Sequence, residues 1–159
     1  MTALVAAQTL YDWLLFLHVL AAMVWVGAGV MLAVIAARVL RDSDPAAIGR
    51  FTANLRVVGP LVLAPASVAV LGLGIALVVD TDAWDFGQLW VQLGLGLFAA
   101  AFLIGAVHQS RTALAAERAA ARNDDGEARR QLRRWSWGYR LIVLLLVVAA
   151  WDMTTKPGQ

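Results

Sequence analysis

The sequence contains no cysteine, a single lysine and only two histidines among its 159 residues. Without cysteine the chain has neither a disulfide framework nor a thiolate metal site. It also contains no nucleotide-binding glycine loop, no catalytic-triad pattern and no metalloprotease motif. These absences leave open whether the chain is an enzyme, and they direct attention to the two histidines, His18 and His108.

Charged residues are scarce as well. They make up 15% of the chain, hydrophobic residues make up 61%, and the mean hydropathy is +0.71, which lies outside the usual range of soluble globular proteins. A bilayer core about 30 Å thick needs about 20 apolar residues per helix. We therefore predict a single four-helix transmembrane domain over residues 1–159, with spans at about residues 11–39, 57–79, 88–110 and 135–152.

Arginine predicts the orientation of these helices. No basic residue precedes the first span, which is also too long for the apolar region of a signal peptide, so we expect it to stay in the mature chain. Arginines concentrate in the first and third connections, so the positive-inside rule places those connections in the cytoplasm and both termini outside. The preference for arginine over lysine is typical of a GC-rich bacterial genome, and we expect the plasma (inner) membrane of a bacterium.

The third connection predicts more than a loop. Helix-forming residues continue past the third span until Asn123-Asp124-Asp125-Gly126, which is typical of a turn followed by a helix N-cap. We therefore predict an all-α, up-down bundle with a cytoplasmic helical hairpin between helices 3 and 4. In the second helix, Gly59-Pro60 and Pro65 predict a kink that would open room for a ligand.

His18 lies in the segment LHVLAAMVWVGAGVM, in which the other fourteen residues are uncharged. Helical spacing puts Ala22, Trp25 and Gly29 on the same face as His18. In the third helix the same spacing predicts a matching face, which carries Gly94, Phe98, Ala101, Gly105 and His108. Polar residues within a membrane avoid lipid, so both faces should point into the bundle, where small residues leave room for a neighbouring helix or a flat porphyrin.

The two histidines are predicted to lie roughly 15 Å apart along the membrane normal, too far apart to ligate one metal. His18 could then ligate one haem alone, each histidine could ligate its own haem, or no haem binds. A neutral His18 ring hydrogen-bonded to a carbonyl, to Ser67 or to Gln92 explains its position equally well. His108 lies at the wet cytoplasmic edge, where it could bind the propionate side of a haem or a partner protein.

Three segments carry a family resemblance: LHVLAAMVWVGAGVM, WDFGQLWVQLGLGLF and WDMTTKPG. Together they resemble the predicted integral membrane proteins of domain of unknown function 2269, over essentially the whole chain. The spacing from His18 to Trp25 and the terminal Lys-Pro are more distantly similar to the CopD copper-resistance membrane domain and the HemJ-type protoporphyrinogen oxidases. The HemJ resemblance implies a haem or porphyrin near His18, with Trp25 in the matching position.

Three functions follow as hypotheses. The first is binding of a b-type haem or porphyrin with a possible redox role, in which His18 ligates iron, Ala22 and Gly29 leave space, and Trp25 and Phe98 pack on the ring. The second is a non-catalytic membrane module that packs with itself or with a partner protein. The third is a small-solute or ion transporter, which is disfavoured because we expect the outer carboxylates, Asp152 among them, to form an exposed rim rather than to lie within a span.

Overall fold

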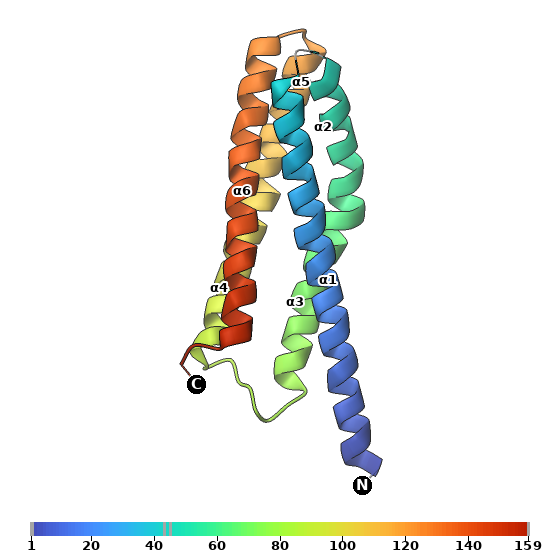
Figure 1. Cartoon of the computed structure of the whole chain (residues 1–159), viewed down its shortest axis with the longest axis vertical. Coiled ribbons are helices and arrows are strands. Elements are labelled where there is room, and N and C mark those ends of the chain that lie inside the picture. The colour runs from blue at the N-terminus through green and yellow to red at the C-terminus, as the bar shows by residue number, and fades with distance from the viewer. Residues whose placement is uncertain (1, 43, 45, 159) are drawn as a thin grey trace.

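The computed structural model describes residues 2–42, 44 and 46–158, with side chains described from residue 9 onward within those ranges. Every regular element in this part of the chain is a helix, and four long rods run up and down side by side (Figure 1). The predicted all-α class is therefore confirmed. In chain order the elements are α1 (Thr2–Arg41), α2 (Ala46–Val58), η1 (Gly59–Leu63), α3 (Ala64–Val79), α4 (Leu89–Leu103), η2 (Ile104–Gln109), α5 (Ser110–Ala121) and α6 (Asp125–Thr155).

Two of the four rods contain a π-helical segment. The second rod passes from α2 through η1 into α3, and the third passes from α4 through η2 into α5. Pro60 lies in η1 and has no N–H to donate, so the hydrogen-bond ladder must change there. At Gly59-Pro60, where a kink was predicted, the structure has a π-helical segment, whereas Pro65 lies in the first turn of regular α3; the kink itself stays a prediction. The segment η2 contains no proline and has no counterpart among the predictions.

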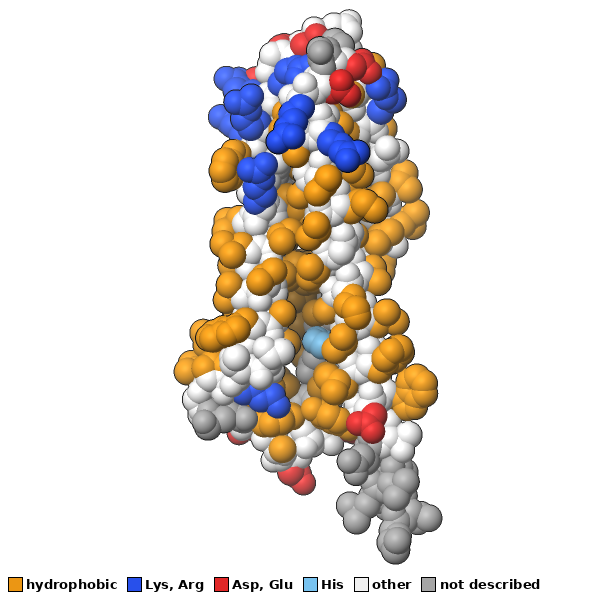
Figure 2. Space-filling view, in the orientation of Figure 1, with side chains coloured by type: hydrophobic (Ala, Val, Ile, Leu, Met, Phe, Trp, Pro, Cys, Tyr) orange, Lys and Arg blue, Asp and Glu red, His pale blue; other side chains and the backbone are white. Residues whose placement is uncertain are grey.

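The outer surface of the rods suits a lipid environment. Each rod contains a stretch long and apolar enough to cross a membrane. Large apolar side chains such as Leu61 and Val79 are 70% exposed, and such a surface is stable only when lipid or another apolar partner covers it. Figure 2 shows an apolar band over the middle of the molecule, with Lys and Arg gathered mainly at one end. Both the length of the helices and their apolar outer surface therefore support a four-helix membrane bundle.

The hairpin between the third and fourth spans is present as predicted. Helix α5 ends at Ala121, Asn123 takes the left-handed conformation with φ 57°, and the Asp124 side chain accepts a hydrogen bond from the N–H of Glu127 to begin α6. Figure 1 places this hairpin at the end of the bundle opposite both chain ends. The side of the membrane on which the hairpin lies stays a prediction.

The packing differs between the two halves of the bundle. Near the hairpin, α1, α2, α5 and α6 surround the largest apolar cluster; we call this the closed half. Toward the chain ends, α3 packs along α1 and α4 packs along α6, and smaller clusters join these two pairs; we call this the open half. The closed-half cluster consists of Leu32, Ala36, Ile48, Phe51, Ala116, Ala119, Ala128, Leu132, Trp135 and Tyr139.

Candidate functional site

A cavity of about 610 Å³ lies between the second and third rods. Both π-helical segments line it, one on each wall: η1 contributes Gly59, Pro60 and Leu63, and η2 contributes Gly105, Ala106 and Gln109. A π-helical turn is wider than an α-helical turn and often marks a functional site. We call this cavity the lateral groove.

The lateral groove has a buried floor and an exposed rim. Its floor includes the buried residues Trp25, Ala101, Tyr139 and Ile142. Its rim includes Pro60, Ala64, Phe102 and Ala106, all of which are exposed on the side of the bundle. The rim belongs to two rods that are long and apolar enough to cross a membrane, so this part of the lateral groove would face lipid in a bilayer.

One end of the lateral groove is polar. Arg56 of α2 and Glu117 of α5 form an ion pair across it, with 3.0 Å between the Arg56 Nη1 and the Glu117 Oε1. Gln109 donates its amide to the carbonyl of Trp135 at 3.1 Å, while its buried Oε1 has no partner among the described residues. A ligand in this groove would therefore meet hydrogen-bonding groups at the closed-half end and apolar side chains elsewhere.

His18 is buried, as the sequence predicted, but it does not line the lateral groove. A Cβ built on Gly74 of α3 would lie 3.1 Å from the His18 Cε1, so the imidazole rests directly on the α3 backbone. The main chain of Val70, one turn earlier on α3, also lies close to the ring. The ring nitrogen Nδ1 is buried and has no partner among the described residues.

The sequence left a carbonyl, Ser67 and Gln92 open as partners of His18, and a bond to a carbonyl stays a prediction. Ser67 instead donates to the carbonyl of Ala64 at 2.8 Å, and Gln92 donates to the carbonyl of Phe86 at 3.2 Å. Both side chains satisfy local backbone groups near their own position in the chain, and neither is recorded as a partner of His18.

The other predicted residues of the first helix face inward. Trp25 and Gly29 are buried and Ala22 is half-buried. Trp25 contacts Phe98 of α4, with ring centroids 5.5 Å apart. A Cβ on Gly29 would lie 2.9 Å from the Tyr139 Cε1, so the Tyr139 ring occupies the space beside Gly29 that the haem hypothesis needs for the macrocycle.

The prediction that His108 faces into the bundle is wrong. His108 is exposed, and the next residue, Gln109, is buried in its place. Both residues lie in η2, where the wider π-helical turn shifts the side-chain register of α4 relative to that of α5. The predicted inward face is correct from Gly94 to Ala101, because these residues precede the π-helical turn. It is wrong at His108, because the prediction assumed α-helical spacing through that turn.

Asp152 is a buried polar residue that the sequence reasoning placed on an exposed rim. It is only 2% exposed, and both carboxylate oxygens are buried without a partner among the described residues. A Cβ on Gly94 of α4 would lie 3.4 Å from the Asp152 Oδ2 and 3.2 Å from the Met153 Cε, so these side chains fill the space beside that glycine. Asp152 follows Gly138 and Leu145 at intervals of seven residues, and both of these residues are half-buried on α6. This spacing could have indicated that Asp152 lies on the inward face of the helix.

His18 and Asp152 both lie in the open half. His18 rests on Gly74, one helical turn from Val78 of α3, and Asp152 rests against Gly94, one turn from Trp90 of α4. Val78 and Trp90 belong to one apolar cluster, so both polar residues lie near that cluster. We call His18 and Asp152 the polar layer. Among the described residues no set of three His, Cys, Asp or Glu side chains could hold a metal ion.

Comparison with known proteins gives a family and no function. The family model described as "Predicted integral membrane protein (DUF2269)" matches residues 12–157, which include the lateral groove, the polar layer and all of the four rods except the first ten residues of α1. No curated protein and no solved structure matches the chain. The match covers most of the chain, and the chain therefore belongs to this family of predicted integral membrane proteins.

Proposed function

We propose that this protein binds an amphipathic molecule dissolved in the bilayer, and that the ligand enters the lateral groove from the side. The apolar part of such a ligand would lie over Trp25 and Ala101, and its polar group would lie near Arg56, Gln109 and Glu117. The distance from Arg56 to Ser67 along the second rod is about 16 Å, so the groove suits an elongated molecule rather than a small ion.

The observation that carries this proposal is the pair of π-helical segments on facing walls. Each π-helical turn interrupts the regular α-helical hydrogen-bond pattern, and π-helical turns are rare. Here both π-helical segments line the same cavity. If the segments served only to accommodate Pro60, a distortion in the second rod alone would suffice. The second distortion, in a rod without a proline at that level, is expected when both walls shape a binding groove.

The test is to block the groove at its rim. Ala106→Trp places a large side chain on an exposed lining residue, and Ala99→Trp makes the same change at an exposed residue of the third rod that does not line the groove. Each protein is purified from native membranes in mild detergent, and its organic extract is compared by mass spectrometry with the extract of the whole membrane.

We expect an apolar species that is enriched with the wild-type protein, lost with Ala106→Trp and retained with Ala99→Trp. Equal enrichment with both variants would locate the bound molecule outside the groove. An extract of the wild-type protein that matches the bulk membrane composition would contradict the proposal.

Haem or porphyrin binding through His18 is a second candidate. The observation that favours it is the buried Nδ1 of His18, which has no partner among the described residues and is a suitable iron ligand. The fit is incomplete, because α3 closes on the imidazole at Gly74, Tyr139 lies beside Gly29, and Asp152 and Met153 lie beside Gly94. We therefore derive no chemical step through haem.

An absorption spectrum decides this second candidate. Purified protein from haem-sufficient cells is measured oxidised and dithionite-reduced, beside His18→Ala and His108→Ala. The haem candidate predicts a Soret band that disappears in His18→Ala and persists in His108→Ala. A colourless wild-type protein would remove the candidate without affecting the proposal for the lateral groove.

We further propose that the protein lies in the plasma membrane of a bacterium, with its termini outside and its hairpin in the cytoplasm. The arginines at the hairpin end support this orientation. A cysteine introduced at exposed Ala121, beside the hairpin turn, should react with a membrane-permeant maleimide in intact cells but not with an impermeant one. Labelling by the impermeant reagent would reverse the orientation.

A further inference from the structure

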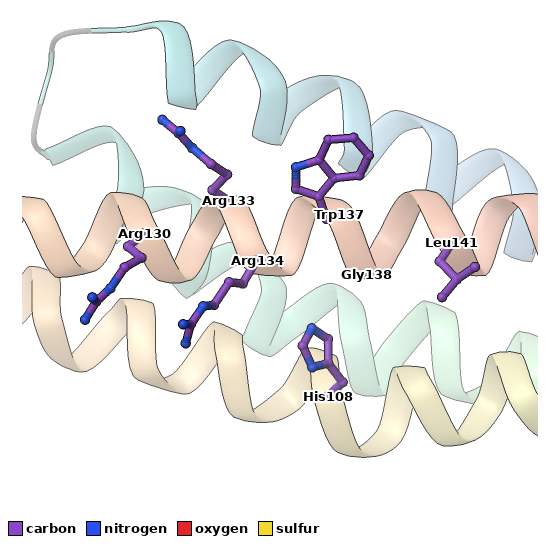
Figure 3. A pocket seen from close by; sticks show the side chains of 7 residues that line it. All are labelled: His108, Arg130, Arg133, Arg134, Trp137, Gly138 and Leu141. Atoms are coloured by element: carbon purple, nitrogen blue, oxygen red, sulfur yellow. The ribbon is translucent and has the colours of Figure 1, made fainter.

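A second cavity, of about 540 Å³, lies between η2 and α6 on another seam of the bundle. We call it the arginine pocket. Figure 3 shows Arg130 and Arg134 extending from α6 on the side of the helix that faces His108. The residues that line the arginine pocket are His108, Arg130, Arg133, Arg134, Trp137, Gly138 and Leu141.

Gly138 brings His108 into this pocket. A Cβ at position 138 would lie 2.7 Å from the His108 Cδ2, which is closer than real Cβ contacts, and 3.1 Å from its Nε2. Glycine at this position therefore lets the imidazole lie against α6 in the observed rotamer. The π-helical turn of η2 turns His108 out of the bundle core, and Gly138 supplies the surface that receives it.

The arginine pocket has excess positive charge. Arg130 forms an ion pair with Glu127, which lies one turn earlier on α6. Within the part of the chain that the structure describes, no ion pair of Arg133 or Arg134 is found. Arg130 and Arg134, on the side of α6 that faces His108, thus have one carboxylate ion-pair partner between them, while Arg133 extends from the other side of the helix (Figure 3). An anion is the ligand that this charge favours.

The far side of the pocket is lined by the apolar side chains of Trp137 and Leu141, with the Arg140 guanidinium 4.9 Å from the centre of the Trp137 ring. Trp137 is 64% exposed and Leu141 is 45% exposed, and Leu141 belongs to the apolar part of α6. Tryptophan is typical of the boundary between the bilayer core and the headgroups. The arginine pocket therefore spans from the headgroup level, at Arg130 and Arg134, to the acyl-chain level at Leu141.

We propose that the arginine pocket binds the phosphate group of an anionic phospholipid. Arg130 and Arg134 lie one helical turn apart and contact the phosphate oxygens, and His108 donates a ring N–H to the same group. One acyl chain follows Trp137 and Leu141 into the bilayer. This site lies on a different seam from the lateral groove, and its occupation is independent of the function proposed above.

Native mass spectrometry of the full-length protein in mild detergent tests the site. The probes are phosphatidylglycerol, phosphatidylcholine of the same chain length, and inorganic phosphate. Arg134→Gln removes one pocket charge from an exposed position, which keeps the core intact, and Arg111→Gln removes one charge from an exposed hairpin position outside the pocket.

We expect one phosphatidylglycerol to bind in preference to phosphatidylcholine. Its affinity should fall about fivefold in Arg134→Gln and stay unchanged in Arg111→Gln. Equal losses in the two variants would reduce the effect to general charge attraction and overturn the site. Equal binding of the two lipids would do the same. Displacement of phosphatidylglycerol by millimolar inorganic phosphate would replace the lipid with free phosphate as the ligand.

Discussion

The closed and open halves of this bundle are built from the same four rods but differ in what they bury. The closed half buries large aromatic and aliphatic side chains, and Trp135 stacks on Tyr139 with ring centroids 4.8 Å apart. The open half buries the polar layer, whose His18 Nδ1 and Asp152 carboxylate have no partners among the described residues. The lateral groove lies beside the junction between the halves.

This difference indicates a division of roles. Well-packed apolar clusters hold helices in place, whereas unpaired buried polar atoms cost free energy and are retained where they contribute to function. The closed half therefore holds the four helices together. The open half and the lateral groove carry the features that packing alone does not explain. The burial of Asp152 shows that the exposed rim expected for the outer carboxylates is wrong at this residue, and transport stays a hypothesis.

The largest expected effect comes from the closed-half core. Leu132 is 1% exposed, and Leu132→Ala should lower the free energy of unfolding by about 2–5 kcal/mol, because a cavity remains where the side chain was. Leu146→Ala, in the smaller cluster that joins the helix pairs, should cost less. Chemical denaturation of both variants in one detergent measures this. Equal losses would remove the contrast between the halves.

A second prediction concerns the contact between His18 and Gly74 of α3. Gly74→Ala should lower the free energy of unfolding by about 1–3 kcal/mol, because its Cβ would overpack the imidazole. In a His18→Ala background the same substitution should cost little, which a double-mutant cycle measures. Gly72→Ala is the matched control, since a Cβ there meets open space. Additive losses would show that His18 does not rest on Gly74.

A third prediction concerns Asp152. Asp152→Asn should raise the free energy of unfolding by about 1 kcal/mol at neutral pH, because a neutral amide of the same shape avoids burying an unpaired carboxylate. The exposed Asp82→Asn should have no measurable effect. Thermal melts of both variants provide the measurement. A destabilised Asp152→Asn would contradict this prediction.

The smallest effect is expected at the hairpin turn. Asp124 caps α6 by accepting the N–H of Glu127 at 3.1 Å, and Asp124→Ala should lower the free energy of unfolding by about 0.5–1 kcal/mol. Asp125→Ala removes an acid from the same turn without removing this cap, and its loss should be smaller. Identical denaturation curves for the two variants would show that the cap does not stabilise the closed half.

Much of the fold followed from composition and local pattern. The long apolar runs predicted the four membrane helices, Asn123 and Asp124 predicted the hairpin turn, and Gly59-Pro60 predicted a distortion of the second helix. These features are local: a bilayer requires each span to form its own hydrogen bonds, and caps and prolines act within one turn. Helical spacing also predicted that the faces of Trp25 and Phe98 point into the bundle, where the two rings in fact contact each other rather than a ligand.

The candidate site depended on tertiary structure. The π-helical turn of η2 moved His108 from the predicted inner face to the arginine pocket, because one wide turn changes the register of every later residue. Asp152 became a buried residue because α4 presents Gly94 to it, and a sequence does not state which glycine faces which carboxylate. The sequence by itself thus determined the number, length and apolar character of the helices through local hydrogen bonding and hydropathy. Only the packing of one helix against another decided which polar groups are buried and where a ligand has room.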